Sequence, residues 1–256
     1  MIQRMLGRKL GQMIVAVGLG LALAVPMAEA QHNFSPEQKT EVEKIIRDYL
    51  LANPELLVEV MEELERRRKE TAKLESQRQI EQYRAQIYES EYDVVVNQEG
   101  EVPFVEFFDY QCGFCKRALK AVQTIRKARP DVRIIYKEYP ILGPISVYAA
   151  RAALASHRQE KYVEYHDALM AHRGKLDEGM VLRIAEGVGL DIELLQADMG
   201  RPEVQQAIKS NLALAERMRI RGTPTFIIGE SLSPGAIDYS QMIAQIEEAR
   251  TNCKVC

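Results

Sequence analysis

A pair of cysteines between a strand and a helix is the feature that most constrains the fold of this chain. A short apolar run with strand composition, Phe104 to Phe108, leads into Cys112-Gly113-Phe114-Cys115, where a helical pattern begins. Backbone N–H groups and the helix dipole stabilise a thiolate at Cys112 and lower its pKa. Cys115, one turn further on, is placed to attack a mixed disulfide at Cys112 and release the substrate. The arrangement predicts a redox-active cysteine pair in an α/β fold.

Two other interpretations of this cysteine pair carry less weight. A structural disulfide across so short a segment closes too small a loop to constrain the unfolded chain much. A zinc site needs two more ligands, and the spacing of His157, His166 and His172 fits no pair of ligands one helical turn apart. We therefore expect neither a metal site nor another cofactor, and we interpret the three histidines as ordinary surface or packing residues.

Residues 1–30 have the layout of a secretory signal peptide. Basic residues precede an apolar run from Met13 to Val25, and small residues surround an expected cleavage site after Ala30. The apolar run is shorter than the ~20 residues that a membrane span needs. We expect the mature chain to reach an oxidising, exported compartment. The full sequence has a formal net charge of −3 with both signs well mixed, which gives no basic surface for nucleic acid.

Residues 31–90 are predicted to form a helical extension and connector. Ser35 and Pro36 begin one helix, and Asn53-Pro54 begins a second, each with an apolar stripe along one face. After residue 65 the pattern becomes strongly polar, which favours a solvated connector over a core helix. Two interpretations are open. Either a partner chain covers the apolar stripes, or the two helices fold back on the rest of the same chain.

From residue 91 the pattern is that of an α/β domain. Strands are predicted at 92–96, 102–108 and 132–137, with a helix from the cysteines to about Ala128. Two buried strands joined by a helix favour a parallel pair with a crossover connection. Residues from about 144 to 220 are helical throughout, with breaks at glycines, so we expect a long helical insertion.

A proline opens the strand that follows the insertion. In Gly222-Thr223-Pro224-Thr225, such a proline is ordinarily an edge or turn residue, and an X-Pro bond is cis in only ~5–6% of cases. The sequence pattern by itself does not select the cis form.

Together these segments resemble the DsbA-like branch of the thioredoxin-fold thiol oxidoreductases, over about residues 92–250. The resemblance implies a thioredoxin fold with a helical insertion, preceded by the helical extension. It also implies a nucleophilic Cys112, a resolving Cys115 and a cis-proline at Pro224. Thr223 and Pro224, with Gly113 and Phe114, are then expected to contact the substrate.

One further residue follows from the same resemblance. Glu106 matches the family's buried acid, which acts as a proton relay or raises the energy of the thiolate, and Lys137 is its expected partner. A solvated position of Glu106 on the sheet surface is the alternative.

The extension resembles that of ScsC-like proteins, linked to suppression of copper sensitivity, in which it drives formation of trimers or dimers. This resemblance implies a periplasmic homo-oligomer that shuffles disulfides in misfolded exported proteins and is reset by a membrane thiol-disulfide partner. Disulfide isomerisation is favoured. The alternatives are a DsbA-like disulfide oxidase, a copper-binding protein and a non-catalytic adaptor that binds exposed chains.

A second cysteine pair, Cys253-x-x-Cys256, ends the chain. No strand precedes it and no helix follows it to activate a thiolate. It is open to three interpretations: a passive disulfide, a mobile dithiol that exchanges with Cys112, or a clamp for Cu(I).

Overall fold

The computed structural model describes residues 34–253, which form two compact units. The first ends at Glu59 and the second runs from Val60 onwards. The predicted signal peptide lies outside the described residues. Within residues 34–253, no helix is both long enough and apolar enough to span a membrane.

The first unit consists of α1 (Pro36–Ala52) and the start of α2 (Glu55–Gln82). The predicted cap at Ser35 is present, because its side chain accepts a hydrogen bond from Gln38 N and its backbone N–H bonds the Gln38 side chain. None of the residues of α1 is buried. Its apolar stripe, which includes Val42, Ile45, Ile46 and Tyr49, is exposed in the single chain.

The second unit is organised around a five-stranded sheet in the order β1-β3-β2-β4-β5. Its strands are β1 (Val94–Val96), β2 (Val102–Phe108), β3 (Val132–Glu138), β4 (Thr225–Ile228) and β5 (Ser231–Pro234). The pair β2 and β3 is parallel, as predicted, and α4 (Gly113–Ala128) is the crossover between them. The other neighbouring strands are antiparallel.

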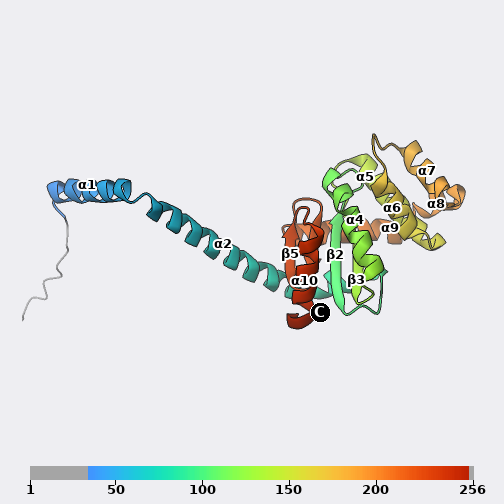
Figure 1. The fold of residues 1–256 in the computed structure, drawn as a ribbon. Helices are drawn as coiled ribbons and strands as arrows, with labels where there is room; N and C mark the ends of the chain where they lie inside the picture. Colours follow the sequence, from blue (N-terminus) through green and yellow to red (C-terminus); the bar gives the residue numbers. More distant parts are fainter. Residues whose placement is uncertain (1–33, 254–256) are drawn as a thin grey trace, which may run out of the picture. The chain divides into compact units, whose positions relative to one another are not determined.

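The two faces of the sheet support two separate cores. Phe104 and Phe108 of β2 point to the face covered by α4 and α10 (Tyr239–Asn252), which lie in front of the strands in Figure 1. Val105 and Phe107 point to the opposite face, where the last turns of α9 (Pro202–Arg217) pack. This alternation places Glu106 on the α4 side.

The predicted helical insertion is confirmed. It contains α5 (Pro144–Ser156), the short 3₁₀ turn η1 (His157–Gln159), α6 (Tyr162–Ala171), α7 (Glu178–Gly187), α8 (Ile192–Asp198) and α9. Figure 1 shows α5 to α8 gathered to one side of the strands. The boundaries follow the sequence signals, since α5 and α9 begin at prolines and Asp177 and Asp191 cap α7 and α8.

The expectation of a wholly solvated connector is wrong for its last turns. Ile80 of α2 and Ile87 and Tyr88 of α3 (Arg84–Tyr88) are buried in the core beneath the second face of the sheet. The Tyr88 hydroxyl donates to Gly229 O at 2.6 Å. The thin apolar stripe of the connector is therefore concentrated where it meets the catalytic body.

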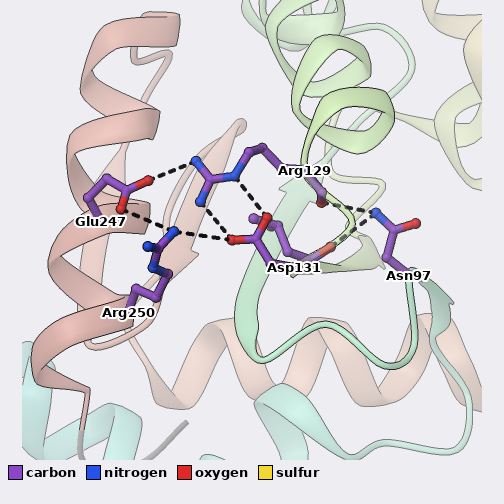
Figure 2. Close-up of polar contacts among 6 residues, drawn as sticks. Asn97, Arg129, Asp131, Glu247 and Arg250 are labelled. Carbon is purple, nitrogen blue, oxygen red and sulfur yellow. Dashed lines mark hydrogen bonds and ion pairs between the residues drawn. The ribbon is translucent and has the colours of Figure 1, made fainter.

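A polar network closes the end of the sheet opposite the cysteines (Figure 2). The side chain of Asn97 donates to three backbone carbonyls around the turn between α4 and β3. Its φ of +57° is the left-handed conformation that asparagine tolerates. Arg129 contacts both Asp131 at 2.7 Å and Glu247 of α10 at 2.9 Å, and thereby ties this turn to α10.

Candidate active site

Cys112 occupies the N-cap position of α4, directly before Gly113. Its carbonyl accepts the first hydrogen bond of the helix from Lys116 N at 3.1 Å, so the backbone N–H groups of the first turn are free to face the sulfur. Cys115 follows in the first turn. Both cysteines are free thiols and both are buried, with exposed fractions of 6% for Cys112 and 1% for Cys115.

The loop before Cys112 is held by Asp109, a residue that the sequence interpretation missed. This buried carboxylate accepts hydrogen bonds from Gln111 N at 2.8 Å and from Ser146 Oγ at 2.7 Å. It also accepts from the backbone N–H groups of Ile141 and Leu142 at 2.8 and 2.9 Å. The sequence contained one signal for this role, an acidic residue directly after a buried strand. A buried carboxylate needs hydrogen-bond donors, and at such a position the N–H groups of nearby loops supply them.

The Thr223–Pro224 peptide bond is cis and lies against the cysteines. The thiol of Cys112 donates to Thr223 O at 3.1 Å. Segments separated by more than a hundred residues in sequence are thus brought into contact, since β4 begins next to Pro224 and pairs with β2. The Thr223 carbonyl thus lies within hydrogen-bond distance of the Cys112 sulfur.

The environments of the two thiols separate their acidities. The pKa of Cys112 is lowered to about 5, and the largest cause is a hydrogen bond from the Cys115 side chain. Hydrogen bonds from Thr223 and from the backbone N–H groups of Cys115 and Phe114 also lower it. Together these hydrogen bonds outweigh burial, which raises the pKa of Cys112. Burial, the hydrogen bond to Cys112 and the nearby Glu106 charge raise the pKa of Cys115 far above its ordinary value. At neutral pH the geometry gives a thiolate at Cys112 and a thiol at Cys115.

Glu106 lies in the middle of β2, buried on the same face as α4. The alternative of a solvated position is therefore wrong. Burial, together with the charge of Cys112, raises the pKa of Glu106 to about 8. A carboxyl group with this pKa exchanges a proton readily near neutral pH.

The expectation that Lys137 is the partner of Glu106 is wrong. In the β2–β3 register Glu106 lies opposite Tyr136, and Lys137 lies opposite Phe107. Because neighbouring residues of a strand point to opposite faces, Lys137 points away from Glu106. Its ammonium group is buried on the other face, where it bonds the carboxylate of Asp93 and the carbonyl of Gln86.

Exposed apolar side chains lie close to Cys112 in the sequence and on the loop at residues 141–142, which bonds Asp109 and Gln111. Phe114 is 56% exposed, and the Arg117 guanidinium lies over its ring at 4.0 Å from the centroid. Ile141 and Leu142 are also exposed, and the Gln111 side chain bonds the carbonyl of Leu142 at 3.3 Å. Exposed apolar side chains of this kind suit contact with an unfolded polypeptide.

His166 and His172, two of the three histidines interpreted as surface or packing residues, lie in α6 and directly after it. His166 is buried, contacts Tyr110 OH through Nδ1 at 3.1 Å, and packs against four aromatic rings. Burial lowers its pKa to about 3, so the ring is neutral. The carbonyl of His172 accepts from the Lys116 ammonium at 2.7 Å. His166 is thus a packing residue.

Of the C-terminal pair, only Cys253 is among the described residues. Cys253 is disulfide-bonded and caps α10 through its N–H to Ala249 O. Cys256 lies outside the described residues. Between residues 34 and 253 there is no group of three or more histidine, cysteine or acidic side chains placed to hold a metal ion.

A family model for the DSBA-like thioredoxin domain matches residues 104–247, which is more than half of the chain and includes both reactive cysteines and Pro224. The chain belongs to this family. A second model, described as the copper resistance protein ScsC N-terminal domain, matches residues 38–70. The fold is thus the DsbA-like thioredoxin fold with a helical insertion and an N-terminal helical extension.

Solved structures of related proteins agree with this assignment. A thioredoxin-like oxidoreductase from Silicibacter pomeroyi is 46% identical, with a TM-score of 0.65 over 66% of this chain and 98% of its own. The thiol-disulfide exchange protein α-DsbA2 from Wolbachia pipientis is 28% identical, with a TM-score of 0.67 over 70% and 97%. BcfH from Salmonella enterica Typhimurium is 29% identical, with a TM-score of 0.71 over 84% and 96%, so it is similar in the extension as well.

The curated relatives are larger proteins. Na⁺/H⁺ antiporters NhaA from Salinispora tropica and from a Mycobacterium species are 27% and 31% identical to 61% and 57% of this chain. The matched part is 24–25% of their own length, so this chain spans about a quarter of the curated relatives it matches.

Proposed function

We propose that the protein is a thiol-disulfide oxidoreductase that acts on the disulfides of exported proteins. The observation that carries this proposal is the pairing of Cys112, whose pKa is lowered to about 5, with a buried Cys115 thiol of raised pKa. Membership of the DSBA-like thioredoxin family supports it. The cis Thr223–Pro224 bond beside Cys112 leaves a backbone edge against which an extended substrate can pair.

The chemistry proceeds in two exchanges. The Cys112 thiolate attacks one sulfur of a substrate disulfide, which forms a mixed disulfide and releases the other substrate sulfur as a thiolate that takes up a proton. Cys115 then loses its proton to the Glu106 carboxylate and attacks Cys112. The Cys112–Cys115 bond forms, the bond to the substrate breaks, and the departing thiolate takes up a proton. The protein is oxidised and the substrate reduced; the reverse sequence introduces a disulfide.

Disulfide isomerisation by a homo-oligomer, a trimer or a dimer, is the form of this activity that the extension favours. Most of the apolar stripe of α1 is exposed, with Leu50 half-buried, and a second copy would bury it. The match of residues 38–70 to the ScsC N-terminal domain supports the same interpretation. Several reactive pairs in one assembly allow one site to hold a misfolded chain while another attacks it.

The cellular setting follows from the leader. Residues 1–30 would direct the chain to the periplasm, where the clients are exported proteins that are unfolded or carry wrong disulfides. An isomerase must be kept reduced there, so a membrane thiol-disulfide partner would reset the Cys112–Cys115 pair. We propose no metal and no organic cofactor for this activity.

Reactivation of a scrambled multi-disulfide protein tests the proposal, with residues 31–256 as the catalyst. Cys112→Ser should abolish reactivation, and the double change Ile45→Glu with Ile46→Glu should reduce it severely. Thr40→Glu with Arg47→Gln changes the charge equally on the opposite side of α1, because seven residues make about two helical turns. That control should remain active.

The outcomes separate the alternatives. Activity that survives Cys112→Ser would overturn the proposal and leave a non-catalytic adaptor. A DsbA-like oxidase would give a different result. The parent chain would not reactivate the scrambled protein, and both α1 variants would oxidise a reduced substrate quickly.

Copper handling is the second candidate function, favoured by the family name that residues 38–70 match. In this hypothesis both cysteine pairs, Cys112 with Cys115 and Cys253 with Cys256, supply soft thiolate ligands when reduced. A Cu(I) titration of the fully reduced protein should lose one binding step when Cys253 and Cys256 are both changed to Ser. An unchanged titration would remove the tail from this function.

A further inference from the structure

Glu106 has two neighbours across the sheet, and one of them is a tyrosine. Tyr136 of β3 is paired with Glu106, and Phe226 of β4 is paired with it on the other side. Both neighbours are fully buried, and only Tyr136 offers a polar group. Its hydroxyl accepts a hydrogen bond from Arg126 Nη1 at 2.9 Å. The sheet register thus joins Glu106 to a cation on α4.

Arg126 is enclosed, although it lies in the last turn of a surface helix. Its side chain is only 8% exposed, and it forms two hydrogen bonds with Asp167 of α6, at 3.1 and 2.5 Å. A buried ion pair contributes little net stability, because desolvation offsets the attraction. Because Arg126 bonds Tyr136, the strand neighbour of Glu106, the ion pair can act on the Glu106 carboxyl group as well as on the fold.

Three charged groups act on Glu106, two from α4 and one from α6. The Cys112 sulfur at the start of α4 and Asp167 on α6 raise the pKa of Glu106, and Arg126 lowers it. Glu106 in turn raises the pKa of Cys115. From β3 Tyr136 presents only a hydroxyl, and His166 of α6 is neutral. Arg126 is the single cation among these groups.

We propose that Arg126 and Asp167 are positioning residues for Glu106: anchored on Tyr136, the pair sets how readily the Glu106 carboxylate takes the proton of Cys115. The proposal rests on the proposed thiol-disulfide activity and deepens it. In this proposal the cation that acts on Glu106 is Arg126 of α4, and not Lys137 of the neighbouring strand. Arg126 bonds Tyr136, which lies on the same face of the sheet as Glu106. The insertion helix α6, which carries Asp167, thereby becomes part of the control of the thiol chemistry.

The test is a titration of the Glu106 carboxyl group in the reduced, full mature chain. Carbon NMR of glutamate labelled at the side-chain carboxyl follows its ionisation, and Glu106→Gln identifies the signal by its loss. The parent midpoint should lie at about 8. Arg126→Gln should move it up, and Asp167→Asn should move it down, each by roughly one pH unit, the low end of the effect of a nearby charge.

Three controls keep a structural role apart from an electrostatic one. Circular dichroism establishes that each variant is folded. Arg126→Lys keeps the charge but loses the paired hydrogen bonds, so its midpoint should stay near that of the parent. The rate of resolution of a mixed disulfide at Cys112, measured against pH, should shift in the same order as the midpoints.

Opposite shifts in Arg126→Gln and Asp167→Asn support the proposal. Unchanged midpoints, or shifts in the same direction, overturn it and leave the pair as a clamp between α4 and α6. The titration does not depend on turnover. Failure of the proposed function, seen as activity in Cys112→Ser, is therefore distinguishable from failure of this inference.

Discussion

The thiols of Cys112 and Cys115 lie one helical turn apart yet differ in chemistry, because the structure gives each a different environment. Cys112 receives hydrogen bonds at the start of α4, and Cys115 is enclosed in the core beside Glu106. In the proposed mechanism this difference sets the order of attack, Cys112 first and Cys115 second.

Alkylation of the reduced protein tests the acidity of Cys112. The pKa of Cys112 is lowered to about 5, so its alkylation rate should rise as the pH rises through 5 and then level off. Cys115 should remain unmodified. Cys115→Ala should move the midpoint up, because it removes the strongest hydrogen bond to the Cys112 sulfur. Mass spectrometry of the modified peptides assigns each site; a midpoint near the ordinary value of 9.0 would contradict the account.

Glu106→Gln should stabilise the reduced protein, and the gain should grow with pH. The pKa of Glu106 is raised from 4.5 to about 8, so between these values the folded state holds a proton that the unfolded state has lost. The parent chain therefore loses stability as the pH rises through this window, whereas the variant does not. The gain at its upper end should be on the order of a few kcal/mol, since one pKa unit is ~1.4 kcal/mol.

Denaturant unfolding across this pH range measures the effect. The gain should be smaller in the oxidised protein, because the disulfide removes the Cys112 charge that adds to the pKa of Glu106. A gain that is independent of pH would show that packing, and not ionisation, causes it.

The sequence predicted where Cys112, Cys115 and Glu106 lie in the fold better than it predicted the residues that contact them. Lys137 was wrongly chosen as a partner because the resemblance did not determine the register, and a shift of one residue moves a side chain to the other face. Arg126 was missed because a basic residue in the last turn of a helix ordinarily faces solvent. Asp109 was missed because its hydrogen bonds come from a loop that is distant in sequence.

Among the elements, α2 changes character along its length. Its first turns are exposed, and its last turn contributes Ile80 to the core under the second face of the sheet. Lys73 and Glu75 add ion pairs with Glu248 of α10 and with Arg219, at 3.2 and 3.3 Å. A catalytic fragment that begins at residue 91 would therefore lose core residues, so point variants of the full mature chain are the better test of the extension.

Ile80→Ala should destabilise the second unit by about 2–5 kcal/mol, because it leaves a cavity under the sheet. Leu74→Ala is the matched control on the same helix. Leu74 is exposed, so this change should cost no more than ~0.5 kcal/mol. Denaturant unfolding followed by circular dichroism compares the two. Equal losses would mean that the end of α2 is not part of the core.

Helices were predicted well because prolines and capping residues mark their starts, as at Pro144, Pro202 and Asp177. The edge strand β5 was not predicted. Its sequence, Ser231 to Pro234, contains a single large apolar residue, and its pairing with β4 is a tertiary effect. The helix α3 was not predicted either, because five residues are too few to show a periodic pattern.

The extension and the catalytic body differ in how they bury their apolar residues. The body buries its apolar residues in two cores, whereas α1 buries none of its own. Apolar side chains gain stability when they leave water, and we propose that a second copy covers this stripe; folding of α1 onto the catalytic body is the alternative. Sequence patterns detect such a stripe but contain no information on the number of copies that share it.

The α1 stripe predicts the mass of the protein in solution. The mature chain should sediment as a dimer or trimer, and Ile45→Glu with Ile46→Glu should sediment as a folded monomer, because two charges cannot be buried in an apolar interface without a large cost. Thr40→Glu with Arg47→Gln should keep the parent mass. A monomeric parent chain would contradict the oligomer and, with it, the proposed basis of isomerisation.

Trapping the mixed disulfide would show whether Cys112 is the attacking sulfur of a thiol-disulfide oxidoreductase. Reduced Cys115→Ser, incubated with a peptide that contains a disulfide, should accumulate a mixed disulfide that mass spectrometry locates at Cys112, because the resolving thiol is absent. The parent chain should accumulate little. Attachment of the peptide to the tail cysteines instead of Cys112, or no attachment at all, would contradict the account.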